Sequence, residues 1–311
     1  MKKLLISAAL SVMAAAGAMA QGWTPPGPIK MIIAFAAGGG ADTQARMIAD
    51  EMQNRLGWEV IPEQVTGGGG LNAAVELAGS ANDGTVIAMV VTESLGYNNV
   101  ANGSPVSLDD FTPLSTTAGF QMGIVSQSGE WETFQDVIDD AKAGEEIVFG
   151  TMSPKLSDLA YLLGQANDVE FNITQVRGGR AVMNGVVGGD MDLGWMAGIQ
   201  TGGVKDGTLV NLASGIGKPL DASPDAPLTS EFGLEFLADG YFMFAAPASI
   251  PAEAAQAMAD AIAEITSDES TDAGALIKRA FGGPTLIQLD DLTAQIEVET
   301  AAAEAILAAV Q

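Results

Sequence analysis

Short apolar runs alternate with helical patterns along most of the 311-residue chain, and this alternation constrains the fold more than any other feature. Residues 30–35 (Lys-Met-Ile-Ile-Ala-Phe) are typical of a buried strand, and residues 41–56 show helical spacing up to the stop at Gly57. Further strands are predicted at residues 59–65 and 86–91, with a helix at 71–78 between them. Repeated units of this kind predict an α/β fold with a mostly parallel sheet covered by helices.

An apolar stretch without clear period, residues 111–127, separates this first series from a second one that runs from residue 134 to residue 213. We therefore expect two lobes joined by two crossings, near residues 118–125 and near residues 241–246. In this division residues 21–120 and 245–311 form lobe one, and residues 121–244 form lobe two. The chain length agrees, because about 150 residues per domain predicts two domains.

The first twenty residues have the three parts of a secretory signal peptide. Two lysines precede an apolar run at residues 4–16, and Ala18-Met19-Ala20 fits the small-x-small cleavage pattern, which places cleavage before Gln21. No later segment has about 18 consecutive apolar residues, so we expect a soluble mature chain exported to the periplasm.

Composition excludes several classes of function. The chain has no Cys and no His, which removes thiolate and imidazole ligands and the commonest general base. The net charge is -26, and residues 1–20 contribute two lysines and no acid, so the chain from Gln21 onward carries -28. Such a field repels nucleic acid phosphates and anionic lipids.

Two glycine runs lie between a predicted strand and a predicted helix, residues 38–40 and residues 67–70. Such loops present backbone N–H groups at a helix N-terminus, where anions bind. Dinucleotide and P-loop motifs fail on spacing: Thr43 and Asn72 stand where the third glycine is needed, and the only Gly-Lys is followed by Pro219. Position alone leaves two alternatives, an anion site and a plain tight turn.

Six motifs in order resemble the tripartite tricarboxylate transporter receptor family, the Bug-type periplasmic binding proteins. The first is the apolar strand followed by Phe35-Ala36-Ala37-Gly38-Gly39, then Asp42 and Ala45-Arg46. The others are residues 67–72, 82–85, 176–181, 188–193 and 225–233. Together they span nearly the whole mature chain. Val176 and Arg180 depart from the Tyr and the small or Pro residue usual in the family, at segments expected to face the pocket, and these departures leave the ligand open.

The resemblance implies a two-lobed, type II-like periplasmic binding protein that grips an organic carboxylate in a cleft between the lobes. We expect a di- or tricarboxylate ligand, a membrane permease as partner, a monomer, no cofactor, no metal and no catalytic residues. Two alternatives stay open: a secreted carboxylate-metabolising enzyme of similar shape, and a ligand-presenting sensor subunit. The expected ligand-binding residues are Phe35, Ala37, Gly38, Gly39, Gly40, Asp42, Gly67, Gly68, Gly69, Thr92, Ser94, Thr151, Met152, Ser153, Arg177, Gly178, Gly179, Arg180 and Met196.

Some of these residues have two interpretations. Asp42 can cap its helix, or it can accept a hydrogen bond from a bridging water or from a ligand amine or hydroxyl, and we expect the cap and water roles together; Arg46, four residues on, can pair with it. Arg180 is either a solvated side chain or the reader of a second ligand carboxylate, which a guanidinium binds in a bidentate manner. Met196 is either core or pocket wall.

Overall fold

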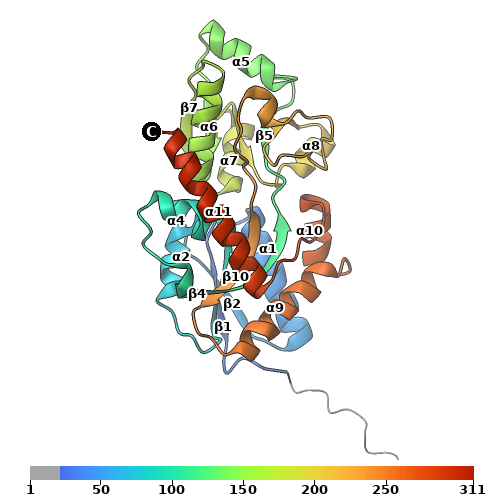
Figure 1. The fold of residues 1–311 in the computed structure, drawn as a ribbon. Coiled ribbons are helices and arrows are strands. Elements are labelled where there is room, and N and C mark those ends of the chain that lie inside the picture. The colour runs from blue at the N-terminus through green and yellow to red at the C-terminus, as the bar shows by residue number, and fades with distance from the viewer. Residues whose placement is uncertain (1–21) are drawn as a thin grey trace, which may run out of the picture.

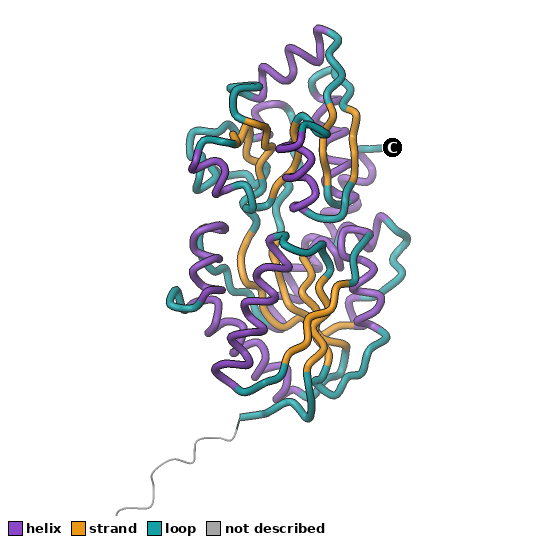
Figure 2. The backbone as a smooth tube through the Cα atoms, turned by 180° about the vertical axis from the view of Figure 1, so that it is seen from behind, coloured by secondary structure: helices purple, strands orange, loops and turns teal. Residues whose placement is uncertain are grey.

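The computed structural model describes residues 22–311, so the predicted signal peptide and its cleavage site lie outside the described part. Two β-sheets, each with its own helices, lie one above the other, with the first sheet in the lower half of Figure 1. Figure 2 shows the same two layers of strands from behind. The α/β architecture with two lobes predicted from the sequence is confirmed.

The first sheet has the strand order β2-β1-β3-β10-β4. Its strands are β1 (Ile29–Ile33), β2 (Val60–Gln64), β3 (Val86–Val91), β4 (Phe111–Gly119) and β10 (Tyr241–Pro247). β1 runs parallel to β2 and β3, and β10 runs antiparallel to β3 and β4. All six residues of β3 are buried, because the strand lies in the middle of the sheet with both faces covered.

The second sheet repeats this plan with the order β7-β6-β8-β5-β9. Its strands are β5 (Gly123–Gln127), β6 (Val148–Thr151), β7 (Asn172–Gln175), β8 (Leu193–Met196) and β9 (Leu209–Ser214). β6 is parallel to β7 and β8, and β5 is antiparallel to β8 and β9. Each sheet is thus parallel in three strands, as the βα pattern predicts, and antiparallel where a strand arrives from the other lobe.

The helices cover the faces of the two sheets (Figure 1). Those around the first sheet are α1 (Gly40–Glu51), α2 (Leu71–Ala78), α3 (Thr92–Leu95), α4 (Tyr97–Ala101), α9 (Ala252–Ser267) and α10 (Asp272–Phe281). Those around the second are α5 (Phe134–Ala143), α6 (Pro154–Ala166), α7 (Gly179–Gly188) and α8 (Thr201–Asp206). Short helical turns lie at Met52–Leu56, Gly68–Gly70, Leu108–Asp110 and Thr229–Phe232. Among the described residues, no helix has both the length and the apolarity needed to span a bilayer.

Residues 120–122 carry the chain from β4 to β5, inside the crossing predicted near residues 118–125. The return crossing lies directly before the segment that the sequence predicts. Ala238 N still donates to the Gly215 carbonyl of the second lobe, and residues 241–246 belong to β10, which pairs with β3 and β4 within the first sheet. The segment is apolar because it is an inner strand with neighbours on both sides.

The last helix, α11 (Leu289–Ala309), connects the two halves of the molecule. It starts beside β4 in the first lobe and ends beside α6 in the second, which Figure 1 shows as the long red helix crossing the front. The predicted lobe division assigned residues 245–311 to lobe one alone, whereas the structure places the last turns of this helix against lobe two.

Candidate functional site

A cavity of about 50 Å³, here called the central chamber, lies between the two sheets. Both lobes and the first crossing line it. Its lining consists of Phe35, Gly39, Gly40, Ala41, Val91, Glu93, Phe120, Met122, Met152, Ser153, Leu156, Gly179, Ala197, Ile199, Phe242 and Phe281. Most of these groups are apolar, and Glu93 is the only ionisable one.

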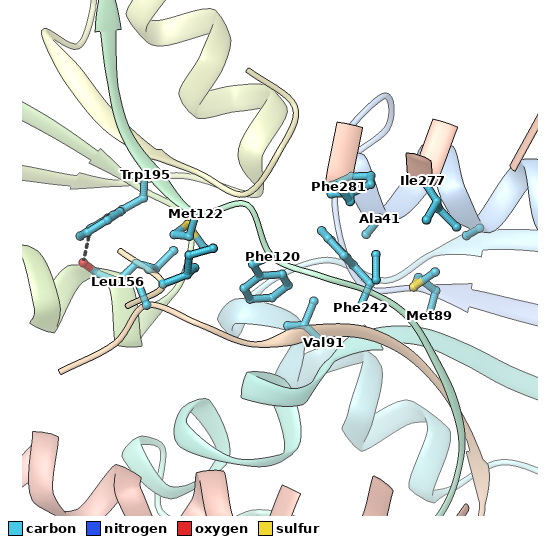
Figure 3. Close-up of a cluster of buried hydrophobic side chains, with 14 of the residues drawn as sticks. Ala41, Met89, Val91, Phe120, Met122, Leu156, Trp195, Phe242, Ile277 and Phe281 are labelled. Carbon is cyan, nitrogen blue, oxygen red and sulfur yellow. Dashed lines mark hydrogen bonds between the residues drawn. The ribbon is translucent and has the colours of Figure 1, made fainter. Parts of the chain in front are cut away.

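Aromatic rings form one wall of the central chamber. Figure 3 shows Phe120 between a second-lobe group that includes Met122 and Leu156 and a first-lobe group of Phe242 and Phe281. The ring centroids of Phe120 and Phe242 are 4.9 Å apart and those of Phe242 and Phe281 are 5.0 Å apart, both edge to face. This geometry is favourable for aromatic pairs and gives the chamber a continuous apolar surface.

The first glycine loop connects β1 to α1. Two of its N–H groups are already used, because Gly38 N donates to Asp42 Oδ2 at 2.8 Å and Gly39 N donates to the Ala36 carbonyl at 3.3 Å. The N–H groups of Gly40 and Ala41 belong to the first turn of α1, where the helix offers no acceptor. Both residues line the central chamber, so this turn presents unpaired donors to a ligand.

Asp42 is buried and serves the protein itself. Its Oδ2 holds the loop through Gly38, and its Oδ1 accepts hydrogen bonds from Arg46 Nε at 2.8 Å and Gln64 Nε2 at 3.2 Å. These contacts match the capping and Arg46-pairing interpretation. Ala37 stands in the same turn and lines none of the cavities found between the lobes.

The second glycine loop, between β2 and α2, has positive φ angles at four consecutive residues, Gly67 to Gly70. Glycine is required at Gly70 for a second reason: a Cβ there would lie 2.2 Å from Ser94 Oγ. The loop lines a second hollow of about 340 Å³ together with Gln175 and Arg177 of the second lobe. The structure therefore brings the predicted Gly67, Gly68, Gly69, Arg177 and Gly178 into one place.

The hydroxyl groups after β3 are bonded to the backbone. Thr92 Oγ1 accepts a hydrogen bond from Tyr241 N at 3.1 Å, and Ser94 Oγ donates to the Gly69 carbonyl at 2.9 Å. Neither residue lines the central chamber, whereas Glu93 between them does. Glu93 is absent from the residues predicted from the sequence, because a carboxylate is not expected to bind an anionic ligand.

Glu93 lies at the contact between the lobes. Its side chain is 3% exposed, its Oε2 accepts a hydrogen bond from Ser153 Oγ at 3.2 Å, and its Oε1 lies 3.6 Å from Lys155 Nζ without a hydrogen bond. Burial raises the pKa of Glu93 above its ordinary value, and the nearby Lys155 ammonium opposes this shift. Burial likewise raises the pKa of Glu299 on α11, which lines another hollow with Glu93 and Lys155.

The segment after β6 provides the second-lobe side of the chamber. Ser153 is the N-cap of α6, and its Oγ accepts a hydrogen bond from Leu156 N at 3.3 Å. Met152 lies between the central chamber and the second hollow, and it lines both. Thr151 points elsewhere, because its Oγ1 is 2.7 Å from Ser157 Oγ and the residue lines none of these cavities.

Arg180 reaches across the cleft at the start of α7. Its Nε donates a hydrogen bond to the Gly38 carbonyl at 2.9 Å, and the side chain lines an outer hollow of about 270 Å³ beside the first glycine loop. Gly179 lines the central chamber. Met196 is fully buried in the core of the second lobe and lines none of the cavities described here. Within residues 22–311, no group of three or more carboxylates is arranged to hold a metal ion.

Comparison with known proteins agrees with this arrangement. The sequence profile described as the Tripartite tricarboxylate transporter family receptor matches residues 44–281. A UPF0065 protein of Bordetella bronchiseptica is 27% identical over 291 residues, which cover 86% of this chain and 81% of the relative.

Two solved structures resemble the fold closely. MatC from Rhodopseudomonas palustris with bound malate has a TM-score of 0.79 at 18% identity, over 93% of this chain and 100% of its own. A second R. palustris protein, solved with adipate, has a TM-score of 0.80 at 19% identity, over 92% and 98% of the two chains. These likenesses show a two-domain periplasmic binding protein fold.

Proposed function

Because the chain belongs to the tripartite tricarboxylate transporter receptor family, we propose that it is a periplasmic receptor that captures a small organic carboxylate and delivers it to a membrane permease of that transporter type. Family membership supports a solute-binding role. We further propose that the protein carries a cleaved signal peptide, resides in the periplasm, acts as a monomer and passes its ligand to a permease.

The observation that carries the proposal is the position of the α1 N-terminus. Its unpaired Gly40 and Ala41 N–H groups meet the central chamber between the lobes. Charge-assisted hydrogen bonds from such groups contribute about 1.5–3 kcal/mol each. The helix dipole adds to the attraction for an anion at this end.

Local donors are necessary because the protein as a whole repels anions. The net charge is -26 for the full sequence, and charges beyond about 8 Å are screened at physiological ionic strength. A carboxylate can therefore bind only where short-range donors outnumber acids. In the central chamber the one acid is Glu93, and burial raises its pKa above the ordinary value.

The lining also restricts the rest of the ligand. Side chains of Phe120, Phe242, Phe281 and Leu156 surround the chamber, so an aliphatic or other apolar body next to the carboxylate fits it. The structural neighbours hold malate in one case and adipate in the other, which supports a carboxylate with two charged ends. We propose the same class for this protein, with Arg177 and Arg180 as candidate partners of the second end.

The predicted lobe division is also part of the proposal. We propose that residues 21–120 and 245–311 act as lobe one and residues 121–244 as lobe two, which close over the ligand. The two sheets support this division. The last turns of α11 and the strand β10 modify its edges, as described above.

A thermal-shift screen of mono-, di- and tricarboxylates tests the proposal. A ligand at 100 times its dissociation constant adds about 2.7 kcal/mol to stability, which a melting curve resolves. A screen in which no carboxylate raises the melting temperature contradicts the proposal. Uptake of the identified ligand by cells with and without the cognate permease then tests delivery.

The substitution Gly39→Val tests the role of the first glycine loop. Gly39 lines the central chamber and has an ordinary φ of -74°, so valine suits the backbone angle, but its Cβ would lie 3.2 Å from the Ala36 carbonyl oxygen, and the loop must shift by a few tenths of an ångström to accept it. We expect binding to fall at least tenfold while the apo melting temperature changes little. Gly27→Val is the control, because nothing lies within 4 Å of a Cβ at that position. Binding that survives within twofold would make the loop a plain turn.

A further inference from the structure

The outer hollow beside the first glycine loop has an unusual charge. Its lining includes Arg180, Lys205 and Arg279 and no Asp or Glu. The chain has 39 acids and only 13 Lys and Arg, and five of the eleven Lys and Arg in residues 22–311 form ion pairs. In residues 22–311, none of these three side chains forms an ion pair, whereas Lys30, Arg46, Arg55, Lys155 and Lys278 do.

The three cations come from both lobes. Arg180 lies on α7 and Lys205 on α8 of the second lobe, and Arg279 lies on α10 of the first. Two hydrogen bonds close the lobes together here: Arg180 Nε to the Gly38 carbonyl at 2.9 Å, and Thr201 Oγ1 to the Ala280 carbonyl at 3.2 Å. The complete cluster therefore exists only when the lobes are in contact.

Closing the lobes brings like charges toward one another. Such repulsion opposes closure unless an anion lies between the cations and bridges them. The hollow has a volume of about 270 Å³, which is ample for a carboxylate and its waters. Gly39, Gly40, Ile199 and Phe281 line both this hollow and the central chamber, so the two cavities share a wall that includes the first turn of α1.

We propose that Arg180, Lys205 and Arg279 form a second anionic subsite that is completed by lobe closure. It takes the distal carboxylate of a ligand whose proximal carboxylate meets the first turn of α1, and it selects dianionic ligands over monoanionic ones of equal length. The inference rests on the proposed function for the proximal contact. Lys205 and Arg279 are absent from the residues predicted from the sequence, because they are exposed cations on separate helices with no motif around them.

Adipate and hexanoate provide a matched pair of probes, since they differ only in the second carboxylate. Isothermal titration compares wild type, the double variant Lys205→Gln/Arg279→Gln, and the control Lys142→Gln/Lys218→Gln, which removes the same charge from exposed sites outside the hollow. We expect wild type to prefer adipate at least tenfold, the control to keep this preference, and Lys205→Gln/Arg279→Gln to reduce it below about threefold with hexanoate affinity unchanged. Equal losses for both probes, or equal behaviour of the two double variants, would overturn the subsite.

A second measurement separates this inference from the proposed function. Sulfate at a few millimolar, compared with NaCl of equal ionic strength, should raise the melting temperature of wild type and the control more than that of Lys205→Gln/Arg279→Gln. A sulfate difference in a protein that binds no carboxylate of the thermal-shift screen would contradict the proposed function and retain the anion subsite. Adipate preference in all three proteins with no sulfate difference would retain the function and refute the subsite.

Discussion

Glu93 is a carboxyl group held almost without water at the contact between the lobes. Ser153 donates one hydrogen bond to it, and Lys155 lies near without donating one. Removing a carboxylate from water costs free energy, and this burial raises the pKa of Glu93. Because Glu93 also lines the central chamber, its protonation state affects both the stability of the fold and the binding of a ligand.

The stability of the protein should therefore depend on pH through Glu93. Its pKa is raised in the folded state above the ordinary 4.5, so this contribution is fully present below pH 4.5 and is lost as pH rises through the folded pKa. Across that window the free energy of unfolding of wild type should fall relative to Glu93→Gln by up to about 1.4 kcal/mol per pH unit.

Urea unfolding from pH 4 to pH 8 measures this slope. Glu145→Gln, which neutralises an exposed carboxyl group, is the control and should run parallel to wild type. Parallel curves for wild type and Glu93→Gln would contradict the prediction.

At the residue scale the sequence predicts the glycine loops better than the polar contacts. Gly67 to Gly70 all have positive φ angles, which glycine adopts readily, so four consecutive glycines in the sequence predict this loop. By contrast, Thr92 and Ser94 are hydroxyl residues after a strand, and nothing local tells whether they face a ligand or their own backbone. Their partners, Tyr241 and Gly69, lie far away in the chain, so only the tertiary structure determines the outcome.

At the scale of elements, α11 and β10 show why some placements are not local properties. The high Ala and Glu content from Asp290 onward favours a helix by intrinsic propensity, and α11 is one. Its lobe assignment was not predictable, because alanine on every face leaves no single apolar stripe to identify the surface it covers. β10 is similar: an apolar run of this length is equally compatible with a central strand and a buried crossing.

The junction that α11 makes with both lobes predicts an asymmetric response to truncation of its side chains. Ile306 is 4% exposed near the second-lobe end, while Val298 on the same helix is 67% exposed. Ile306→Ala should cost about 2 kcal/mol, the low end for a buried Ile, because the last turn can relax around the cavity. Val298→Ala should change stability by less than about 0.5 kcal/mol.

Urea unfolding gives both values, and hydrogen exchange locates the effect. Faster exchange should be confined to the last turns of α11 and the facing part of α6. Equal costs for the two variants would mean that this end of the helix does not hold the lobes together.

At the scale of the whole molecule, the large negative net charge is the main electrostatic feature. The sequence has three acids for each base, and the ion pairs of the described residues involve few of its carboxylates. Self-repulsion therefore opposes the compact state, and salt relieves it by shortening the Debye length from about 10 Å at 0.1 M to about 3 Å at 1 M.

Raising NaCl from 0.05 to 1 M should increase the melting temperature of the apo protein, because screening removes more repulsion than it weakens attraction between surface pairs. Calorimetry measures this, with sorbitol of equal osmolality as the control for excluded cosolute. A melting temperature that stays flat or falls with salt would show that local ion pairs outweigh the net charge.

The α1 first turn has a consequence for how such a receptor can change over generations. A main-chain N–H group survives every substitution except one to proline, so only proline at Gly40 or Ala41 would delete these donors. The phenyl groups of the chamber and the cations of the outer hollow are side chains, and each can be exchanged in one step. If the proposed function is right, the contact with the ligand carboxylate is retained during evolution, while substitutions change the side chains that contact the rest of the ligand. New specificities should then be for other carboxylates.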